Sequence, residues 1–154
     1  MKKILSLLLA FTFVIILSGC GKDKVTTTVC NYTDGDGSKM AFDLSATNDE
    51  IDRVKMTVVP SNTLMGISSF KDLDDDTKNQ IKDAFLAEYG LEKDTYEGLK
   101  IEIVFDDNMN ITFDADLKVA DEEILKKIGM DFEDSDMSLE RAIEDMEAEG
   151  YTCK

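Results

Sequence analysis

The sequence predicts an α+β domain, in which two to three helices pack on one face of an antiparallel sheet of about five or six strands. Three observations favour this fold class. Four segments alternate apolar and polar residues with the period of two that half-buried strands require. Three other segments run up to a glycine, and two of them carry apolar residues at helical spacing. Three strands, a helix, two strands and two helices follow in that order, which is typical of an α+β domain.

The first three strands are expected over residues 25–33, 40–46 and 54–58. The first is rich in Thr, and the Gly-rich residues 34–37 form its turn. The second and third have apolar even positions: Met40, Phe42, Leu44, Ala46, Val54, Met56 and Val58. If the even positions of the first strand share a face with the even positions of the second, Cys30 lies on the same face as Phe42, toward the core.

The next two strands, residues 99–105 and 109–117, have apolar odd positions instead. Residues opposite each other in an antiparallel pair share a face, so the loop between these strands must hold an odd number of residues. A three-residue loop around Asp107 and Asn108 is the simplest solution, because Asn tolerates the positive φ that such a loop requires.

Helices are expected over residues 74–89, 121–128 and 138–149, followed by Gly90, Gly129 and Gly150. Glycine at these positions can adopt the left-handed conformation that ends many helices. The second helix begins with acidic residues and ends with two lysines, which is the order that the helix dipole favours. The final residues, 151–153, are expected to return to the sheet.

The first nineteen residues have the order of an export signal. Two lysines precede a run of fourteen largely apolar residues, 4–17, which is short of the about 20 needed to span a bilayer. Leu17-Ser18-Gly19-Cys20 resembles the lipobox of bacterial lipoproteins, which implies a diacylglyceryl group on Cys20 and cleavage before it. An ordinary signal peptide and an uncleaved apolar helix are the alternatives.

The expected organisation is a signal peptide over residues 1–19, a lipidated tether over 20–24 and a single α+β domain over 25–154. The mature chain would lie on the extracytoplasmic face of the cell membrane, because two acyl chains, such as palmitate, suffice for stable anchoring. Cleavage removes two of the 17 basic residues and none of the 33 acidic ones, so the net charge of −16 becomes 15 − 33 = −18. Lipid, and not surface charge, would therefore hold this acidic protein at the membrane.

The composition excludes several functions. The chain has no His, so it lacks Ser-His-Asp and Cys-His catalytic sets and His-ligated metal sites. Its negative charge argues against nucleic acid as a partner. We expect no enzyme activity, catalytic residue, cofactor or metal site. A carboxylate-pair hydrolase is the remaining enzymatic alternative, although no Trp is present to stack on a sugar.

Two cysteines remain once Cys20 carries the lipid. Cys30 and Cys153 form an even pair near the two ends of an exported domain, where disulfides persist. We expect a disulfide between them. Two free buried thiols or a thiol metal site are the alternatives, but two thiolates without His make a poor zinc site.

Three acidic segments could suggest metal binding. Counted from Asp34, residues 34–38 place Lys39 where an EF-hand loop needs Gly and Ser45 where it needs Glu, so a hairpin turn is favoured. The acidic residues 72–76 precede a helix and are expected to cap it. The acidic residues 131–136 are expected to form a solvated connection, or a weak cation site.

The segment 59–70 differs from its surroundings. Pro60 breaks the strand, and Leu64, Met65 and Ile67 then place apolar side chains in an irregular stretch. Because Met adapts to varied surfaces, these three residues form a candidate edge for binding a partner or a ligand. The alternative is a connection that packs down over the core.

With the lipobox, Cys30, the Pro60 region and the ending Gly150-Tyr151-Thr152-Cys153-Lys154, the chain resembles the YehR-like family of small bacterial lipoproteins. The resemblance implies a compact α+β lipoprotein and transfers no catalytic residue. We expect a monomeric, membrane-anchored binding or interaction module, whose partner is an envelope protein or a small ligand. A structural lipoprotein that maintains the envelope without a small-molecule ligand is the alternative.

Overall fold

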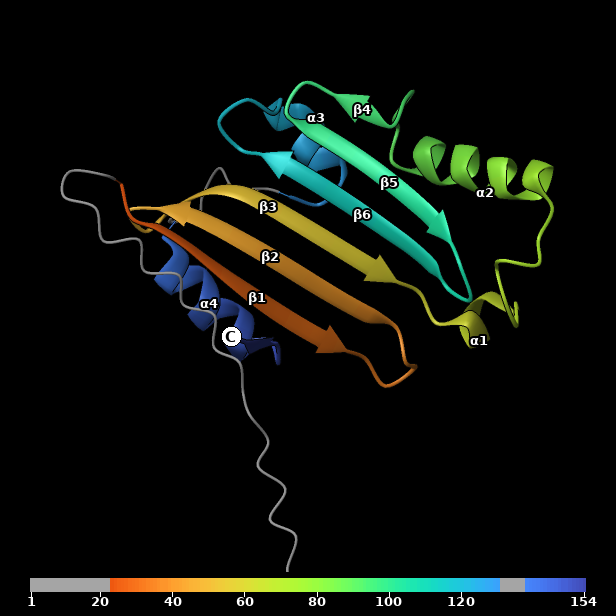
Figure 1. Ribbon diagram of the computed structural model, residues 1–154, viewed down its shortest axis with the longest axis horizontal. Helices are drawn as coiled ribbons and strands as arrows, with labels where there is room; N and C mark the ends of the chain where they lie inside the picture. Colours follow the sequence, from red (N-terminus) through yellow and green to blue (C-terminus); the bar gives the residue numbers. More distant parts are fainter. Residues whose placement is uncertain (1–22, 131–137) are drawn as a thin grey trace, which may run out of the picture.

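Seven strands form one antiparallel sheet, and four helices accompany it in the part of the chain that the structure describes (Figure 1). The computed structural model describes residues 23–130 and 138–154. The predicted signal peptide, Cys20 and the tether residues up to 22 lie outside these ranges, as do the acidic residues 131–137. Among the described residues, no helix is long and apolar enough to cross a membrane.

The strand order across the sheet is β4-β5-β6-β3-β2-β1-β7. The strands are β1 (Val25–Thr33), β2 (Lys39–Thr47), β3 (Glu50–Val59), β4 (Thr95–Tyr96), β5 (Leu99–Phe105), β6 (Met109–Asp116) and β7 (Thr152–Cys153). The helices are α1 (Asn62–Met65), α2 (Asp75–Glu88), α3 (Glu122–Lys127) and α4 (Leu139–Ala148).

The α+β class and the antiparallel sheet are confirmed, whereas the predicted counts of strands and helices are too low. The additional elements are β4 and α1, which have two and four residues. A two-residue strand is too short to show a period of two, and a single helical turn is too short to show a period of 3.6. β4 pairs with the nearby residues Leu99 and Lys100, whereas α1 is held by the distant residues Ser38 and Asp107.

The hairpin of β5 and β6 follows the predicted parity. Phe105 pairs with Met109, which leaves a loop of residues 106–108, and Ile101 pairs with Phe113. The odd residues of β6 are all buried. The three-residue loop is therefore confirmed, because it is the connection that keeps both apolar faces on one side of the sheet. The expected positive φ in this loop is wrong, because none of residues 106–108, Asn108 included, has one.

The hairpin of β2 and β3 contains an irregularity that the period of two does not predict. Thr47 pairs with Glu50, and the two turn residues, Asn48 and Asp49, have positive φ values of 55° and 74°. A bulge shifts the register beside Ala46, so Ile51 is buried although it is an odd residue in a strand whose other buried position is even. Strand β3 consequently begins four residues earlier than the period of two predicts.

The core lies on one face of the sheet, where the buried residues of the strands meet side chains from α2, α3 and α4. Phe113 is at its centre and contacts Phe85 and Tyr89 at the end of α2, with ring centroids 6.1 and 6.2 Å apart. Near the other edge, Tyr151 follows α4 and packs on Phe42 of β2, with centroids 5.8 Å apart. Each of these helices begins at a residue whose side chain accepts a backbone hydrogen bond, namely Asp74, Asp121 and Ser138.

Candidate functional site

Helix α1 presents two apolar side chains on the surface. Leu64 is 63% exposed and Met65 is 44% exposed, whereas Ile67 is half-buried against the core. The three residues of the predicted binding edge therefore separate into an exposed pair and a residue that anchors the segment. We call Leu64 and Met65 the α1 patch.

Hydrogen bonds to two neighbouring loops hold α1 in place. The Asn62 side-chain amide donates to the carbonyl of Asp107 at 2.8 Å, in the loop between β5 and β6. The backbone N–H of Ser61 donates to Oγ of Ser38 at 3.0 Å, in the turn between β1 and β2. The exposure of the α1 patch thus belongs to a fixed single turn, which ends at Gly66 in the left-handed conformation.

The α1 patch lies at the end of the sheet away from the start of the domain. In Figure 1, β1 begins at one end of the sheet, and α1 lies at the other end beside the turns that follow β1 and β5. The register agrees, because Val25 pairs with Thr47 at one end and Thr33 pairs with Lys39, which pairs with Val59, at the other. Nine residues of β1 separate these ends, which corresponds to about 26 Å of strand.

The structure contains the predicted disulfide between Cys30 and Cys153. Cys30 is fully buried and lies in the row of core-facing residues beside Phe42, which confirms the predicted parity of β1. The two Cα atoms are 4.0 Å apart across β1 and β7. Val29 and Lys154 exchange two backbone hydrogen bonds of 3.0 Å beside the disulfide, so the tail is attached to β1 by both covalent and backbone bonds.

The described acidic segments have structural partners. Oδ1 of Asp34 accepts hydrogen bonds from the backbone N–H groups of Asp36 and Ser38, at 2.9 and 2.8 Å, as in a turn closed by an Asp side chain. Asp74 caps α2 by accepting from the backbone N–H of Thr77 at 2.8 Å. Among the described residues, no group of three or more His, Cys, Asp or Glu side chains could hold a metal ion. The predicted acidic segment 131–136 lies outside the described residues.

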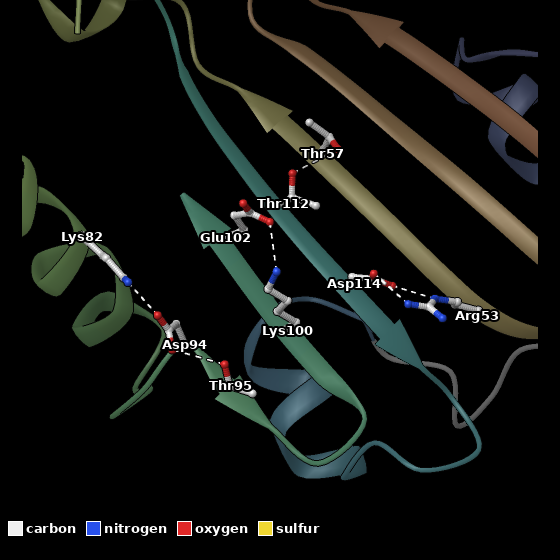
Figure 2. Close-up of polar contacts among 9 residues, drawn as sticks. All are labelled: Arg53, Thr57, Lys82, Asp94, Thr95, Lys100, Glu102, Thr112 and Asp114. Carbon is white, nitrogen blue, oxygen red and sulfur yellow. Dashed lines mark hydrogen bonds and ion pairs between the residues drawn. The ribbon is translucent and has the colours of Figure 1, made fainter. Parts of the chain in front are cut away.

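The carboxylates with altered acidity all have lowered pKa values in the part of the chain that is described. Arg53 lowers the pKa of Asp114 by a bidentate contact, with two hydrogen bonds of 2.8 Å (Figure 2). Lys82 lowers the pKa of Asp94, and Lys71 lowers that of Asp107, through ion pairs of 2.6 Å. A general acid needs a raised pKa, so these carboxylates have the electrostatics of structural ion pairs.

The face of the sheet opposite the core is polar and carries charges in an ordered row. Asp43 of β2 pairs in register with Lys55 of β3, Lys55 pairs with Asp114 of β6, and Asp114 pairs with Lys100 of β5. Figure 2 shows part of this surface, with Thr57 and Thr112 side by side and the ion pairs of Arg53 and Lys100 beside them. The alternation of apolar and polar residues predicts such a polar face but gives it no role. We call this surface the open face.

Comparisons with known proteins show the fold alone. No family model matches the chain, and no curated protein matches it either. Its structure is similar to the NMR structure of the Escherichia coli YehR protein, with a TM-score of 0.61 and 12% identity over 85% of this chain and 91% of that one. It is also similar to the NMR structure of a Streptococcus pneumoniae TIGR4 protein, with a TM-score of 0.51 and 14% identity over 90% of each chain. The chain therefore has a YehR-like fold.

Proposed function

We propose that the chain is a lipid-anchored, extracytoplasmic binding module of the YehR-like lipoprotein family, and that it contacts a protein partner through the α1 patch. The observation that carries the binding role is the exposure of Leu64 and Met65, at 63% and 44%, on a turn held by distant loops. Exposed apolar pairs of this kind are common centres of protein interfaces when polar residues surround them.

The lipobox and the disulfide support the extracytoplasmic location. The residues before Cys20 have the sequence pattern of a lipoprotein signal, and a structural disulfide is typical of exported proteins. Four residues separate Cys20 from Val25, where β1 begins. This short tether keeps the start of β1 close to the bilayer.

The direction of β1 then orients the α1 patch. Because the patch lies about 26 Å of strand away from the start of β1, it points away from the lipid when the domain stands on its tether. The patch is therefore placed to meet a protein in the extracytoplasmic space and not the bilayer itself.

Two measurements on the membrane fraction test this proposal. Intact-mass spectrometry should give a chain that begins at diacylated Cys20. A photo-crosslinking side chain at position 64 or 65 should then join one defined protein in living cells. A crosslinker at Val119, which is 49% exposed and lies near the opposite end, is the matched control.

The outcomes separate the two parts of the proposal. An unmodified Cys20 or an intact Met1 would refute the lipid anchor. Equal labelling from positions 64, 65 and 119 would refute the α1 patch as a docking site and would favour a structural envelope lipoprotein instead. In the supporting outcome, the crosslinked partner disappears when Leu64 and Met65 are changed to Ser, while the Val119→Ser control retains it.

A further inference from the structure

The charge row on the open face has a symmetry that points to a second copy of the chain. Across β2, β3, β6 and β5, its order is Asp43, Lys55, Asp114 and Lys100, which is negative, positive, negative and positive. The midline of this row runs between β3 and β6. Reflecting the row across that midline exchanges each charge for the opposite charge.

A two-fold axis along this midline brings two open faces together with complementary charges. Rotation about an axis parallel to the strands lays β2 of one copy over β5 of the other, and β3 over β6. Asp43 then faces Lys100 of the second copy, and Lys55 faces its Asp114. The same operation places Arg53 opposite Asp116, and Thr57 opposite Thr112, since these residues also pair across the midline.

The charge order also selects the direction of the axis. A two-fold axis perpendicular to the strands would lay each strand on its own copy, so Asp43 would face Asp43 and Lys100 would face Lys100. Like charges in contact cost several kcal/mol at an interface. The axis parallel to the strands is therefore the arrangement that this face can accept. It corresponds to the aligned packing of two sheets, which lie about 10 Å apart with their strand directions near −30° to each other.

The open face is much less acidic than the rest of the protein. The charged residues of β2, β3, β5 and β6 on this face are Lys39, Arg53, Lys55, Lys100, Asp43, Glu50, Asp52, Glu102, Asp114 and Asp116. Their charges sum to 4 − 6 = −2, whereas the whole chain carries −16. Two acidic copies repel each other least when they approach through this face.

The parallel axis is also compatible with two anchors in one membrane. Because the rotation keeps the strand direction, the starts of both β1 strands lie at the same end of the pair. This step rests on the proposed lipid anchor. The four central strands offer roughly 500 Å² per copy, which in total reaches the lower limit of about 1,000 Å² for a specific interface. A dimer of this size is transient in solution and is favoured by confinement on a membrane.

We propose that the chain forms a homodimer through its open face, with Asp43 opposite Lys100 and Lys55 opposite Asp114 of the second copy. This arrangement replaces the monomer expected from the sequence. It leaves the α1 patch free, because that patch lies beyond the ends of the strands that pair.

A zero-length carbodiimide crosslink between Asp43 and Lys100 gives a direct test on the full chain in detergent and in membranes. Within one copy, three strand spacings, or about 14 Å, separate β2 from β5, so this crosslink can form only between copies. We expect it in mass-spectrometric peptide maps of the dimer band, and we expect it to weaken in high salt.

Charge-reversal variants make the test specific. Asp43→Lys alone and Lys100→Glu alone each create two like-charge contacts per dimer and should weaken dimerisation by about 100-fold. A mixture of the two variants restores opposite charges at both positions, so it should form a heterodimer. Asp83→Lys, on the exposed side of α2, is the matched control and should leave dimerisation unchanged.

The outcomes distinguish this inference from the proposed function, because the mass of the same sample reports whether Cys20 is lipidated. A lipidated chain without the Asp43–Lys100 crosslink would overturn the dimer and leave the anchor intact. Failure of the mixed variants to associate, although each is folded by circular dichroism, would also overturn it. If the dimer forms while Cys20 from the membrane fraction is unmodified, the dimer supports the open face and the unmodified Cys20 refutes the anchor.

Discussion

Reduction of the Cys30–Cys153 disulfide should remove a large share of the stability of the domain. The disulfide closes a loop with a sequence separation of 123 residues. Loop-closure entropy for this length corresponds to about 5 kcal/mol at 25 °C, because the open chain has many more unfolded conformations. Domains of ordinary size have unfolding free energies of about 5–15 kcal/mol, so the expected loss is a third of the total or more.

Urea unfolding of the oxidised and the reduced chain measures this effect without any substitution. The two forms differ only in the disulfide, so no cavity is created at the buried Cys30. We expect the midpoint to fall by roughly 2–5 M urea, given slopes of about 1–3 kcal/mol/M for small proteins. A loss below about 1 kcal/mol would refute the loop-entropy reasoning.

Hydrogen exchange separates this global effect from local fraying of the tail. The backbone N–H groups of Val29 and Lys154 bond to each other's carbonyls beside the disulfide. If reduction only releases β7, these two amides will exchange faster while the central amide of Phe113 stays protected. If reduction lowers global stability as we expect, the protection of Phe113 will fall as well.

Two further predictions concern a crowded glycine and an ion pair. Gly98→Ala would place a Cβ against the backbone of Ala120, whose Cα is 2.7 Å away, at a φ of +72°, so we expect a loss of about 2–4 kcal/mol in urea unfolding. Gly129→Ala, at a φ of +80° in open space, should lose only about 1 kcal/mol. Arg53 lowers the pKa of Asp114, so their pairing stabilises the fold above the unfolded pKa near 4 and is lost as pH falls through the lower folded pKa. Asp114→Asn should therefore cost about 0.5–1 kcal/mol at pH 7 and less as the pH falls below about 4, and an equal cost at neutral and acidic pH would contradict this assignment.

Side-chain periodicity was sufficient to predict most of the sheet. The apolar odd positions of residues 99–105 and 109–117 required a loop of odd length, and the structure has a loop of three residues, 106–108. The parity of the first hairpin placed Cys30 on the core face, where the disulfide is found. These inferences held because the side chains of a strand alternate strictly between two faces.

Periodicity failed where the backbone departs from regular geometry. The bulge between β2 and β3 changes the parity at Ile51, and the sequence beside it contains no signal that distinguishes it from a longer turn. The α1 patch was predicted as an apolar edge, but only the loops around it decided that Leu64 and Met65 are exposed while Ile67 packs on the core. Such outcomes depend on residues far away in the chain, including Ser38 and Asp107.

The sequence by itself determined the fold class, the pairing of Cys30 with Cys153, and the set of alternating residues that became the core and the open face. These properties follow from local periodicity and from residue counts, which need no knowledge of neighbouring strands. Only the tertiary structure decided that Asp43, Lys55, Asp114 and Lys100 form one row, since it brings together residues up to 71 positions apart through the order β5-β6-β3-β2. Charge order across a sheet depends on strand order and register, and those are set by packing of the whole chain.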